Sequence, residues 1–422
     1  MDFVILKEEE FDSFAKNHEH CNFHQTTSWG KLKETNGWKS HLVGIKERKK
    51  VIAASLILSK KLPFGNMFYA PRGFLIDFKD SKLLEFFIKE LKKYLKNENA
   101  IFLKIDPYIP YRIRDINGTV ITENGTNDTA INNLKSVGFK HFGFNLYHEA
   151  LQPRFMFRLK VENKTEDDLF KGMEPTTRNL VRKSLKIGIE TRELKENELE
   201  IFKNLMSHTS ERRNFIDRPF SYYKDMYKHL TEKNIIKFMI SEINLDKYIK
   251  RLKEETKETE TIIKEKEHLI SDGKVNENKT RNIIKELEVI INSNNKNIEQ
   301  AKKIKEKKGS NIVLGGILYF TYGNEVLSLL SGAYNDTMNY NSPYLLNFEM
   351  IKYAMNNDYK YYNFYGITGD FNKDSELYGM YDFKRGFGGE VVELIGEFDL
   401  VINKFKFFLY KYSYKLYRII KK

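Results

Sequence analysis

Cysteine is almost absent from this chain of 422 residues, in which Cys21 stands alone. A single cysteine excludes an internal disulfide framework and a cysteine-based zinc site, and it suits a reducing compartment. The nine histidines are scattered without the spacing of metal ligands. We therefore expect no metal and no other cofactor.

Long apolar runs are also missing. No window of the sequence reaches 18 consecutive apolar residues, the length that a transmembrane helix needs. The first residues, MDFVILKEEEFDSF, are acidic where a signal peptide has a basic segment and then an apolar run. These absences lead us to expect a cytoplasmic protein.

Basic residues outnumber acidic ones, which gives the chain a formal net charge of +13. This excess predicts a polyanionic partner, for which nucleic acid, an anionic membrane surface and a phosphorylated substrate remain open. A hydrophobic content of 41% with 14% aromatic residues is ample for two packed cores of about 150 to 200 residues each.

The stretch 243–308 has the composition of two antiparallel helices. It contains no proline, only one glycine, Gly273, and many Lys and Glu residues. Apolar residues recur at three- and four-residue steps on both arms, which is typical of a coiled-coil seam. The expected seam residues are Leu245, Tyr248, Leu252, Thr259, Ile262 and Leu269 on the first arm and Ile284, Leu287, Ile291, Asn294, Ile298 and Ala301 on the second.

The segment Ser271-Asp272-Gly273-Lys274 lies between the two arms and supplies residues that favour a tight reversal. A hairpin returns the chain to its starting point, so the sequence on either side can belong to one domain. A solvated spacer, a self-association arm and a contact with RNA all remain open for this hairpin.

Strands and helices alternate along the rest of the chain. Strands are expected at 38–45, 51–58, 67–71 and 100–106, with a helix over 81–95. A similar order recurs with helices over 196–210 and 219–231, strands at 235–243, 312–322 and 325–332, a helix over 345–357 and a strand at 361–365. We therefore expect a mixed α/β (α+β) protein of two tandem modules, with the hairpin inserted in the second.

Residues 398–422 interleave aromatic side chains with lysines at helical spacing. A basic amphipathic helix of this kind can lie on an anionic bilayer. The alternative is a helix that buries its aromatic face on the core, and the sequence favours neither.

Six motifs follow one another along the chain: QTTSWGKLK at 25–33 with GW at 37–38, YAPRG at 69–73, LKIDP at 103–107, EPTTRNLVRKS at 174–184, RPFSYY at 218–223 and YDFKRGFGG at 381–389. In this order the set resembles the FemABX family of aminoacyl-tRNA-dependent transferases that build peptidoglycan bridges. The hairpin strengthens the resemblance, because FemA-like members carry one at the corresponding place and compact FemX-type members lack it.

The resemblance implies two GNAT-like domains. The first would span 1–150 and be completed by about 380–422, the second would span 151–242 and 309–379, and the coiled coil at 243–308 would be an insertion. The implied reaction transfers an amino acid from aminoacyl-tRNA to the stem-peptide amine of a lipid-linked or nucleotide-linked peptidoglycan precursor. Glycine is the first expectation, with serine and alanine as alternatives. Self-association and peripheral membrane contact through 398–422 stay open.

Three positions match residues that bind the precursor in this family. Lys33 matches a lysine that holds the diphosphate, and Arg218 and Tyr222 match an arginine and a tyrosine that help to bind the phosphates and the muramyl peptide. Physical chemistry agrees, because guanidinium binds two oxygens in a fork and ammonium adds a compact charge. Considered alone, Lys33 could also be an ordinary solvated lysine.

Three further positions match residues placed near the chemistry. Phe383 and Lys384 match a pair at the site of acyl transfer, and Asp106 matches an aspartate discussed as a base. The ammonium of Lys384 is our candidate for stabilising the tetrahedral oxyanion that forms when an amine attacks the ester. Asp106 either orients the amine, takes its proton, or only ends a strand in an Asx turn.

Two other function classes compete with a transferase that uses charged tRNA. A non-enzymatic basic adaptor would bind RNA or an anionic membrane through the hairpin and residues 398–422. An acetyl-CoA-dependent enzyme would need a glycine-containing pyrophosphate loop at a helix N-terminus, and we find no convincing example.

Overall fold

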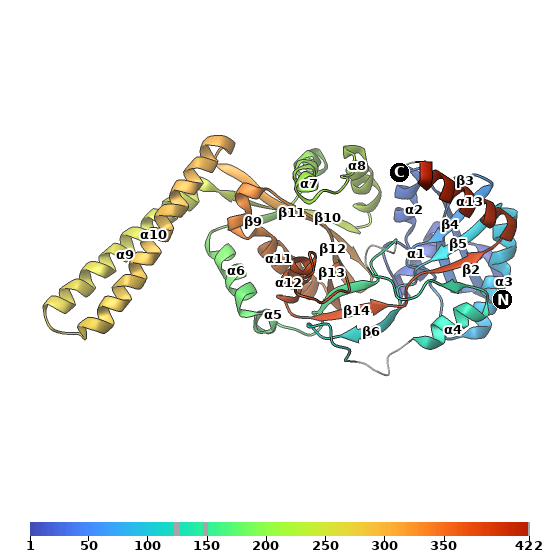
Figure 1. Ribbon diagram of the computed structural model, residues 1–422, viewed down its shortest axis with the longest axis horizontal. Helices are drawn as coiled ribbons and strands as arrows, with labels where there is room; N and C mark the ends of the chain where they lie inside the picture. The colour runs from blue at the N-terminus through green and yellow to red at the C-terminus, as the bar shows by residue number, and fades with distance from the viewer. Residues whose placement is uncertain (122–126, 147–150, 421–422) are drawn as a thin grey trace.

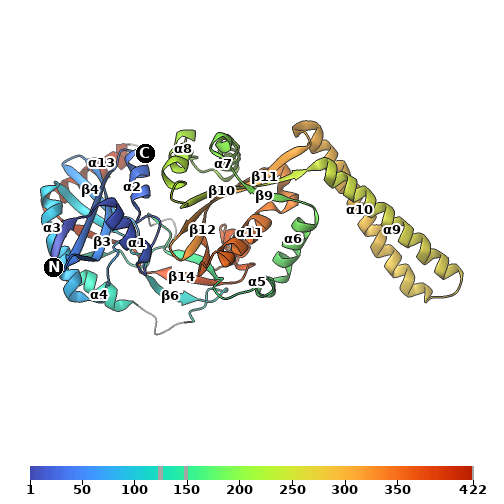
Figure 2. The same cartoon turned by 180° about the vertical axis from the view of Figure 1, so that it is seen from behind.

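The computed structural model describes residues 1–121, 127–146 and 151–420, which form two β-sheets with helices packed on them and one long helical hairpin (Figure 1). The hairpin projects from the second sheet, away from the first (Figure 2). The expected fold class, a mixed α/β protein of two modules with an inserted antiparallel helical hairpin, is confirmed.

The first sheet has the strand order β1-β2-β3-β4-β5-β15-β7. Its strands are β1 (Asp2–Ile5), β2 (Lys39–Glu47), β3 (Lys50–Leu62), β4 (Gly65–Ala70), β5 (Ala100–Ile105), β7 (Lys140–His141) and β15 (Phe398–Val401). The helices of this module are α1 (Glu8–Asn17), α2 (Thr27–Glu34), α3 (Ser81–Asn97), α4 (Asp128–Ser136) and α13 (Lys404–Ile420).

The second sheet has the order β6-β14-β8-β13-β12-β11-β10-β9. Its strands are β6 (Pro110–Arg114), β8 (Phe155–Lys160), β9 (Glu190–Glu193), β10 (Ile236–Asn244), β11 (Asn311–Tyr322), β12 (Glu325–Ala333), β13 (Tyr361–Ile367) and β14 (Glu390–Leu394). The helices are α5 (Glu166–Gly172), α6 (Pro175–Lys186), α7 (Leu199–Arg213), α8 (Phe220–Leu230), α11 (Ser342–Asn356) and α12 (Tyr378–Arg385).

The two modules repeat one sequence of elements. In the first, antiparallel β2, β3 and β4 precede β5, which pairs with β4 in parallel. In the second, antiparallel β10, β11 and β12 precede β13, which pairs with β12 in parallel. Parallel neighbours need a crossover connection, and α3 and α11 provide it.

The modules also exchange strands. β6 follows β5 along the chain but pairs with β14 in the second sheet, and β15 follows β14 but returns to pair with β5 in the first. Residues 110–114 and 390–394, both expected in the first domain, therefore lie in the second sheet. The exact domain boundaries stay a prediction.

The hairpin consists of α9 (Leu245–Ser271) and α10 (Glu277–Lys308), inserted between β10 and β11. Gly273 adopts a φ of +67° at the reversal, a conformation that glycine tolerates best. The backbone N–H of Leu245 donates a 2.7 Å hydrogen bond to the carbonyl of Ser310, so the two ends of the hairpin meet. Across the seam, Asn294 donates a 3.4 Å hydrogen bond to Glu255.

The seam prediction is wrong in the outer half of the first arm. Ile262 and Leu269 are exposed, whereas Ile263 and Ile270 are half-buried. The step from Thr259 to the next seam position is four residues instead of three. Ile263 therefore faces the other arm in place of Ile262, and Ile270 does so in place of Leu269. The inner part of the seam, including Leu252 and Ile298, is buried as expected.

The two modules meet through an aromatic stack. Phe23, just before α2, lies on Phe320 of β11 with ring centroids 3.8 Å apart, and Trp29 of α2 contacts Phe23 edge-on at 5.3 Å. All three rings belong to a buried cluster that draws residues from both modules. This packing fixes α2, the helix that carries Lys33, against the second module.

Candidate active site

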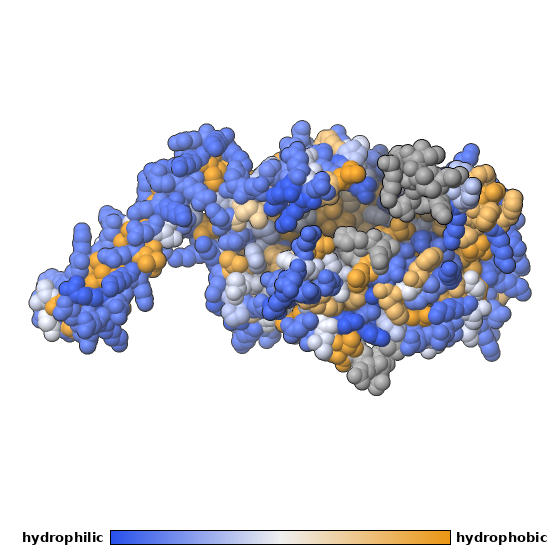
Figure 3. Space-filling model, viewed as in Figure 1, coloured by the Kyte–Doolittle hydropathy of each residue, from blue (hydrophilic) through white to orange (hydrophobic). Residues whose placement is uncertain are grey.

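A cavity of about 460 Å³ lies between the two modules, and the surface is visibly hollowed there (Figure 3). Residues of α2, of the loop between α7 and α8, of α8, β12 and β13, and of α12 line it. Its position follows from the second sheet. β12 and β13 pair only from Glu325 with Tyr361 to Leu327 with Asn363, and beyond that point residues 328–330 and 364–366 face the cavity.

Lys33 enters this cavity from the last turn of α2, a helix capped by the Thr26 side chain. Its Nζ lies 4.5 Å from the ring centroid of Trp29 and 5.9 Å from that of Tyr222. Burial, together with the positive charge of Arg218, lowers the pKa of Lys33 to about 8. Lys33 is therefore a half-buried cation held between aromatic rings and not a freely solvated lysine.

Arg218 and Tyr222 enter the cavity from the second module, at the start of α8. The guanidinium carbon of Arg218 lies 5.5 Å from the ring centroid of Tyr222. Asp217 fixes this turn, because its carboxylate accepts hydrogen bonds of 2.7 Å from the Tyr223 hydroxyl and from the backbone N–H of Arg218. Cations from the two modules thus share the ring of Tyr222.

Lys384 reaches the cavity from α12. Its Nζ donates a 2.6 Å hydrogen bond to the carbonyl of Gly366, and burial lowers its pKa to about 7. Phe383, the neighbouring residue, does not line the cavity. Its ring packs at 4.9 Å on Tyr344 and at 5.5 Å on Phe387, so its side chain supports α12 from the core side.

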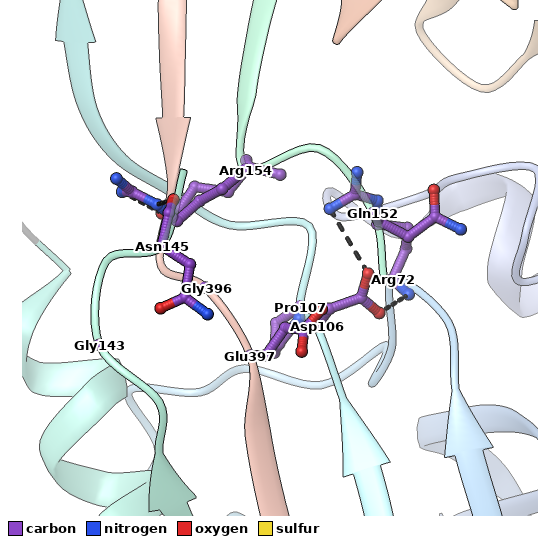
Figure 4. Close-up of a pocket in the computed structure, with 10 residues that line it drawn as sticks. Arg72, Asp106, Pro107, Gly143, Asn145, Gln152, Arg154, Gly396 and Glu397 are labelled. Carbon is purple, nitrogen blue, oxygen red and sulfur yellow. Dashed lines mark hydrogen bonds and ion pairs between the residues drawn. The ribbon is translucent and has the colours of Figure 1, made fainter. Parts of the chain in front are cut away.

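Asp106 lies outside the main cavity. It follows β5 and lines a separate space of about 10 Å³, close to the smallest that can hold one water molecule (Figure 4). Its carboxylate accepts a 2.8 Å hydrogen bond from the backbone N–H of Arg72 and lies 3.6 Å from the Arg72 guanidinium. Burial raises the pKa of Asp106 to about 6 despite the neighbouring cation.

Comparisons with known proteins agree with this arrangement. The profile of the FemAB family matches residues 6–415. Aminoacyltransferase FemA of Staphylococcus aureus, in strain COL among others, is 34% identical over 409 residues, which covers 96% of each chain. The crystal structure of FemX superposes with a TM-score of 0.77 and 26% identity, covering 100% of both chains.

The chain belongs to the FemAB family. It is therefore an aminoacyltransferase, as the motifs indicated, and the non-enzymatic adaptor no longer competes. The resemblance on which the sequence interpretation depended is confirmed over almost the whole chain.

Other residues of this FemAB protein line the cavity without having been singled out. The Tyr365 hydroxyl donates a 2.6 Å hydrogen bond to the Gln152 side chain, and both residues face the cavity. Gln152 also lines the small space beside Asp106 (Figure 4), so it borders both cavities. Tyr365 could have been suspected from its place at the end of an expected strand, whereas Gln152 follows no recognisable pattern.

The glycine run that follows α12 is a packing turn in this FemAB chain. A side chain at Gly388 would approach the Gly172 carbonyl to 2.6 Å, and one at Gly389 would clash with the Arg158 carbonyl. Nearby, Arg178 donates a 2.9 Å hydrogen bond to the carbonyl of Met173, which closes the end of the preceding helix. These residues are occupied by contacts within the protein.

Metal ligands and membrane spans are two other kinds of feature to consider. Within 1–121, 127–146 and 151–420, no group of three or more His, Cys, Asp or Glu side chains could hold a metal ion. In the same ranges, none of the helices has the length and apolar content needed to cross a bilayer.

Proposed function

We propose that this protein transfers an aminoacyl group from charged tRNA to the free stem-peptide amine of a peptidoglycan precursor, and so builds an interpeptide bridge. One observation carries the proposal. Lys33 from the first module, Arg218 from the start of α8 and Lys384 from α12 all line one cavity. No local feature of the sequence requires these three cations to meet.

Lys33 and Arg218 are proposed to hold the diphosphate of the precursor. They enter the cavity from opposite modules and flank the ring of Tyr222, at 5.9 Å and 5.5 Å from its centroid. A fork of guanidinium donors with a compact ammonium charge suits two linked phosphates. Tyr222 offers its ring as an apolar surface beside them.

The transfer step uses Lys384 in this proposal. The neutral amine of the stem peptide attacks the ester carbonyl, and the C–O bond to the tRNA ribose breaks as the new amide C–N bond forms. The proton lost by the amine passes to the departing ribose oxygen. The ammonium of Lys384 stabilises the oxyanion of the tetrahedral intermediate, a contribution worth roughly 3 kcal/mol for a single donor.

Asp106 has a positioning role in the proposal, because it does not line the cavity. It holds Arg72, whose guanidinium donates a 2.9 Å hydrogen bond to the carbonyl of Pro153. Pro153 adjoins Gln152, which lines the cavity. Asp106 thus supports the cavity wall from behind.

The donor RNA is proposed to contact basic side chains on α6 and on the hairpin. Arg182, Lys183 and Lys186 are exposed on α6, and the Lys186 ammonium lies 2.6 Å from Glu255 of α9, so the two basic surfaces adjoin. Binding that depends on phosphate contacts should weaken steeply with added salt. Because charged tRNA is the donor, we place the reaction in the cytoplasm.

The deciding experiment incubates the protein with a mixture of charged tRNAs and either lipid-linked or nucleotide-linked precursor, and identifies the product by mass spectrometry. We expect one amino acid to be added, with glycine as the first expectation and serine and alanine as alternatives. Lys384→Met serves as the inactive control. An unchanged mass with both precursors would refute the proposal.

A further inference from the structure

Helix α13 presents two different aromatic faces. One face packs on the first sheet, where the rings of Phe407 and Tyr410 lie 5.3 Å and 5.5 Å from that of Phe102 on β5. Lys406 reaches the side chain of Asn99 from the edge of this face. These contacts anchor the helix to the first module through one face.

The opposite face is aromatic as well, and it is exposed in the part of the chain that the structure describes. Phe405, Phe408 and Tyr412 are 71%, 66% and 60% exposed. Their spacing of three and four residues puts the three rings in one row along the helix. An exposed row of large rings on an anchored helix indicates a surface that is covered by something else.

The charge around this row identifies what covers it. Lys404 and Lys411 are exposed along the side of the row, and residues 404–422 contain seven Lys or Arg and no Asp or Glu. Aromatic rings flanked by basic side chains of one sign match the region where acyl chains meet anionic headgroups. A packing partner of ordinary protein would not need this uniform charge.

We propose that α13 is an interfacial helix that lies in the headgroup region of an anionic lipid bilayer, with Phe405, Phe408 and Tyr412 directed into it. The helix lies on the bilayer and does not cross it. Its lysines extend toward the lipid phosphates while their aliphatic stems follow the apolar region.

The position of α13 gives this docking a consequence. The helix starts at the outer edge of the first module, and its C-terminal end lies on the side of that module nearer the second one (Figure 1). If the proposed function holds, a docked protein works at the membrane surface, which favours a lipid-linked acceptor. The membrane contact itself does not depend on the reaction.

The test is co-sedimentation of the full chain with vesicles of phosphatidylcholine alone or mixed with phosphatidylglycerol. We expect binding to the mixed vesicles only, weakened by added salt. Phe405→Ser combined with Phe408→Ser and Tyr412→Ser should lower the partition coefficient at least about tenfold, because three rings no longer enter the interface. Lys404→Gln with Lys411→Gln should lower it on the order of 25-fold.

The matched control is Val289→Ser with Ile290→Ser, which removes apolar side chains that are 66% and 42% exposed on α10. We expect this control to bind mixed vesicles as the unmodified protein does. Equal binding by the triple variant would overturn the proposal, as would equally strong binding to pure phosphatidylcholine. A dimer of the unmodified protein in light scattering, with a monomer for the triple variant, would assign the row to contact with a second copy of the chain. That result would also overturn the membrane proposal.

Activity on the soluble nucleotide-linked precursor separates this inference from the proposed function. The triple variant should retain that activity, since its substituted residues do not line the cavity. Vesicle binding without any transfer would refute the transferase proposal and leave the membrane inference standing. Transfer without vesicle binding would refute the membrane inference and leave the transferase proposal standing.

Discussion

Lys384 donates a 2.6 Å hydrogen bond to the carbonyl oxygen of Gly366, beyond the point where β13 stops pairing with β12. The bond fixes the ammonium group at the wall of the cavity between the two modules. Burial lowers the pKa of Lys384 to about 7, so both protonation states are populated near neutral pH. A cation held in this way is well placed to stabilise an oxyanion and costs little reorganisation when the reaction occurs.

Replacing this cation should impair the chemical step. Lys384→Met is expected to lower kcat by about 10² to 10³, as removal of one oxyanion donor does in other acyl transfers. The melting temperature should hold or rise, because methionine removes a buried charge. Lys373→Met, an exposed lysine in the loop before α12, is the matched control. Single-turnover kinetics with charged tRNA measure the effect, and an unchanged kcat would contradict the assigned role.

Binding of the precursor should be coupled to proton uptake. The pKa of Lys33 is lowered to about 8 by burial and by Arg218, and an anionic diphosphate beside it should raise that pKa again. At pH 8 binding should therefore add about half a proton at Lys33. Lys33→Arg keeps the charge but stays protonated throughout, so it should lose this part of the uptake.

Calorimetric titration in buffers of different ionisation enthalpy measures that uptake. The slope of observed enthalpy against buffer enthalpy gives the number of protons bound. Identical slopes for the unmodified protein and Lys33→Arg would show that Lys33 does not meet the anion.

Arg218 should contribute to affinity more than to turnover. Arg218→Met is expected to raise KM for the precursor by roughly tenfold to a hundredfold, the cost of losing charged hydrogen bonds to phosphate. Arg218→Lys should recover only part of this loss, since ammonium cannot bind two oxygens in a fork. Arg213→Met is the control, because Arg213 is exposed at the end of α7 and does not line the cavity. A similar KM for Arg218→Met and Arg213→Met would show that Arg218 does not bind the precursor.

The hairpin is the part of the fold most accessible from the sequence. Its helices and its turn at Gly273 depend on residues close together in the chain, and periodicity reports such local structure well. Periodicity fails where two apolar residues are adjacent. Ile262 and Ile263 fit the seam about equally, and only packing against the second arm selects Ile263.

The strand exchange and the cavity are not encoded locally. Nothing near β6 specifies that it pairs with β14, which lies about two-thirds of the chain length away. The meeting of Lys33, Arg218 and Lys384 was expected from a family resemblance and not from spacing. The place of Asp106 depends on Arg72, whose buried side chain no sequence pattern predicts.

The buried carboxyl of Asp106 should make stability depend on pH. Burial raises its pKa from 3.8 to about 6, so between these values the native state holds a proton that the unfolded chain has released. The contribution of Asp106 to stability is thus complete below about pH 4 and is lost as the pH rises through about 6. Asp106→Asn should abolish this dependence, which amounts to at most about 3 kcal/mol.

Urea unfolding at a series of pH values tests this expectation. The free energy of unfolding of the unmodified protein, minus that of Asp106→Asn, should fall across the window from about pH 4 to about pH 6. Parallel curves for the two proteins would mean that the carboxyl is not buried against Arg72. Asp225→Asn, at a half-buried site on α8, provides a control for the loss of one carboxylate.

Shortening the hairpin should separate its contribution to RNA binding from its contribution to the fold. Leu252 and Ile298 belong to the buried cluster that joins the base of the hairpin to Ile312 and Leu314 of β11. Replacing residues 253–297 by a short Gly-Ser turn keeps that cluster and removes the outer arms. We therefore expect the melting temperature to change by only a few degrees.

The same shortened protein should bind charged tRNA more weakly if the outer arms contact RNA, with a smaller dependence of affinity on salt. Each lost phosphate contact lowers the slope of log affinity against log salt by about 0.9 for a duplex. The control keeps the arms and replaces only Val289 with serine, which leaves every basic side chain of the hairpin in place. An unchanged affinity together with an unchanged salt slope would exclude the outer arms from tRNA binding. A lower molecular mass in light scattering would instead assign them to self-association.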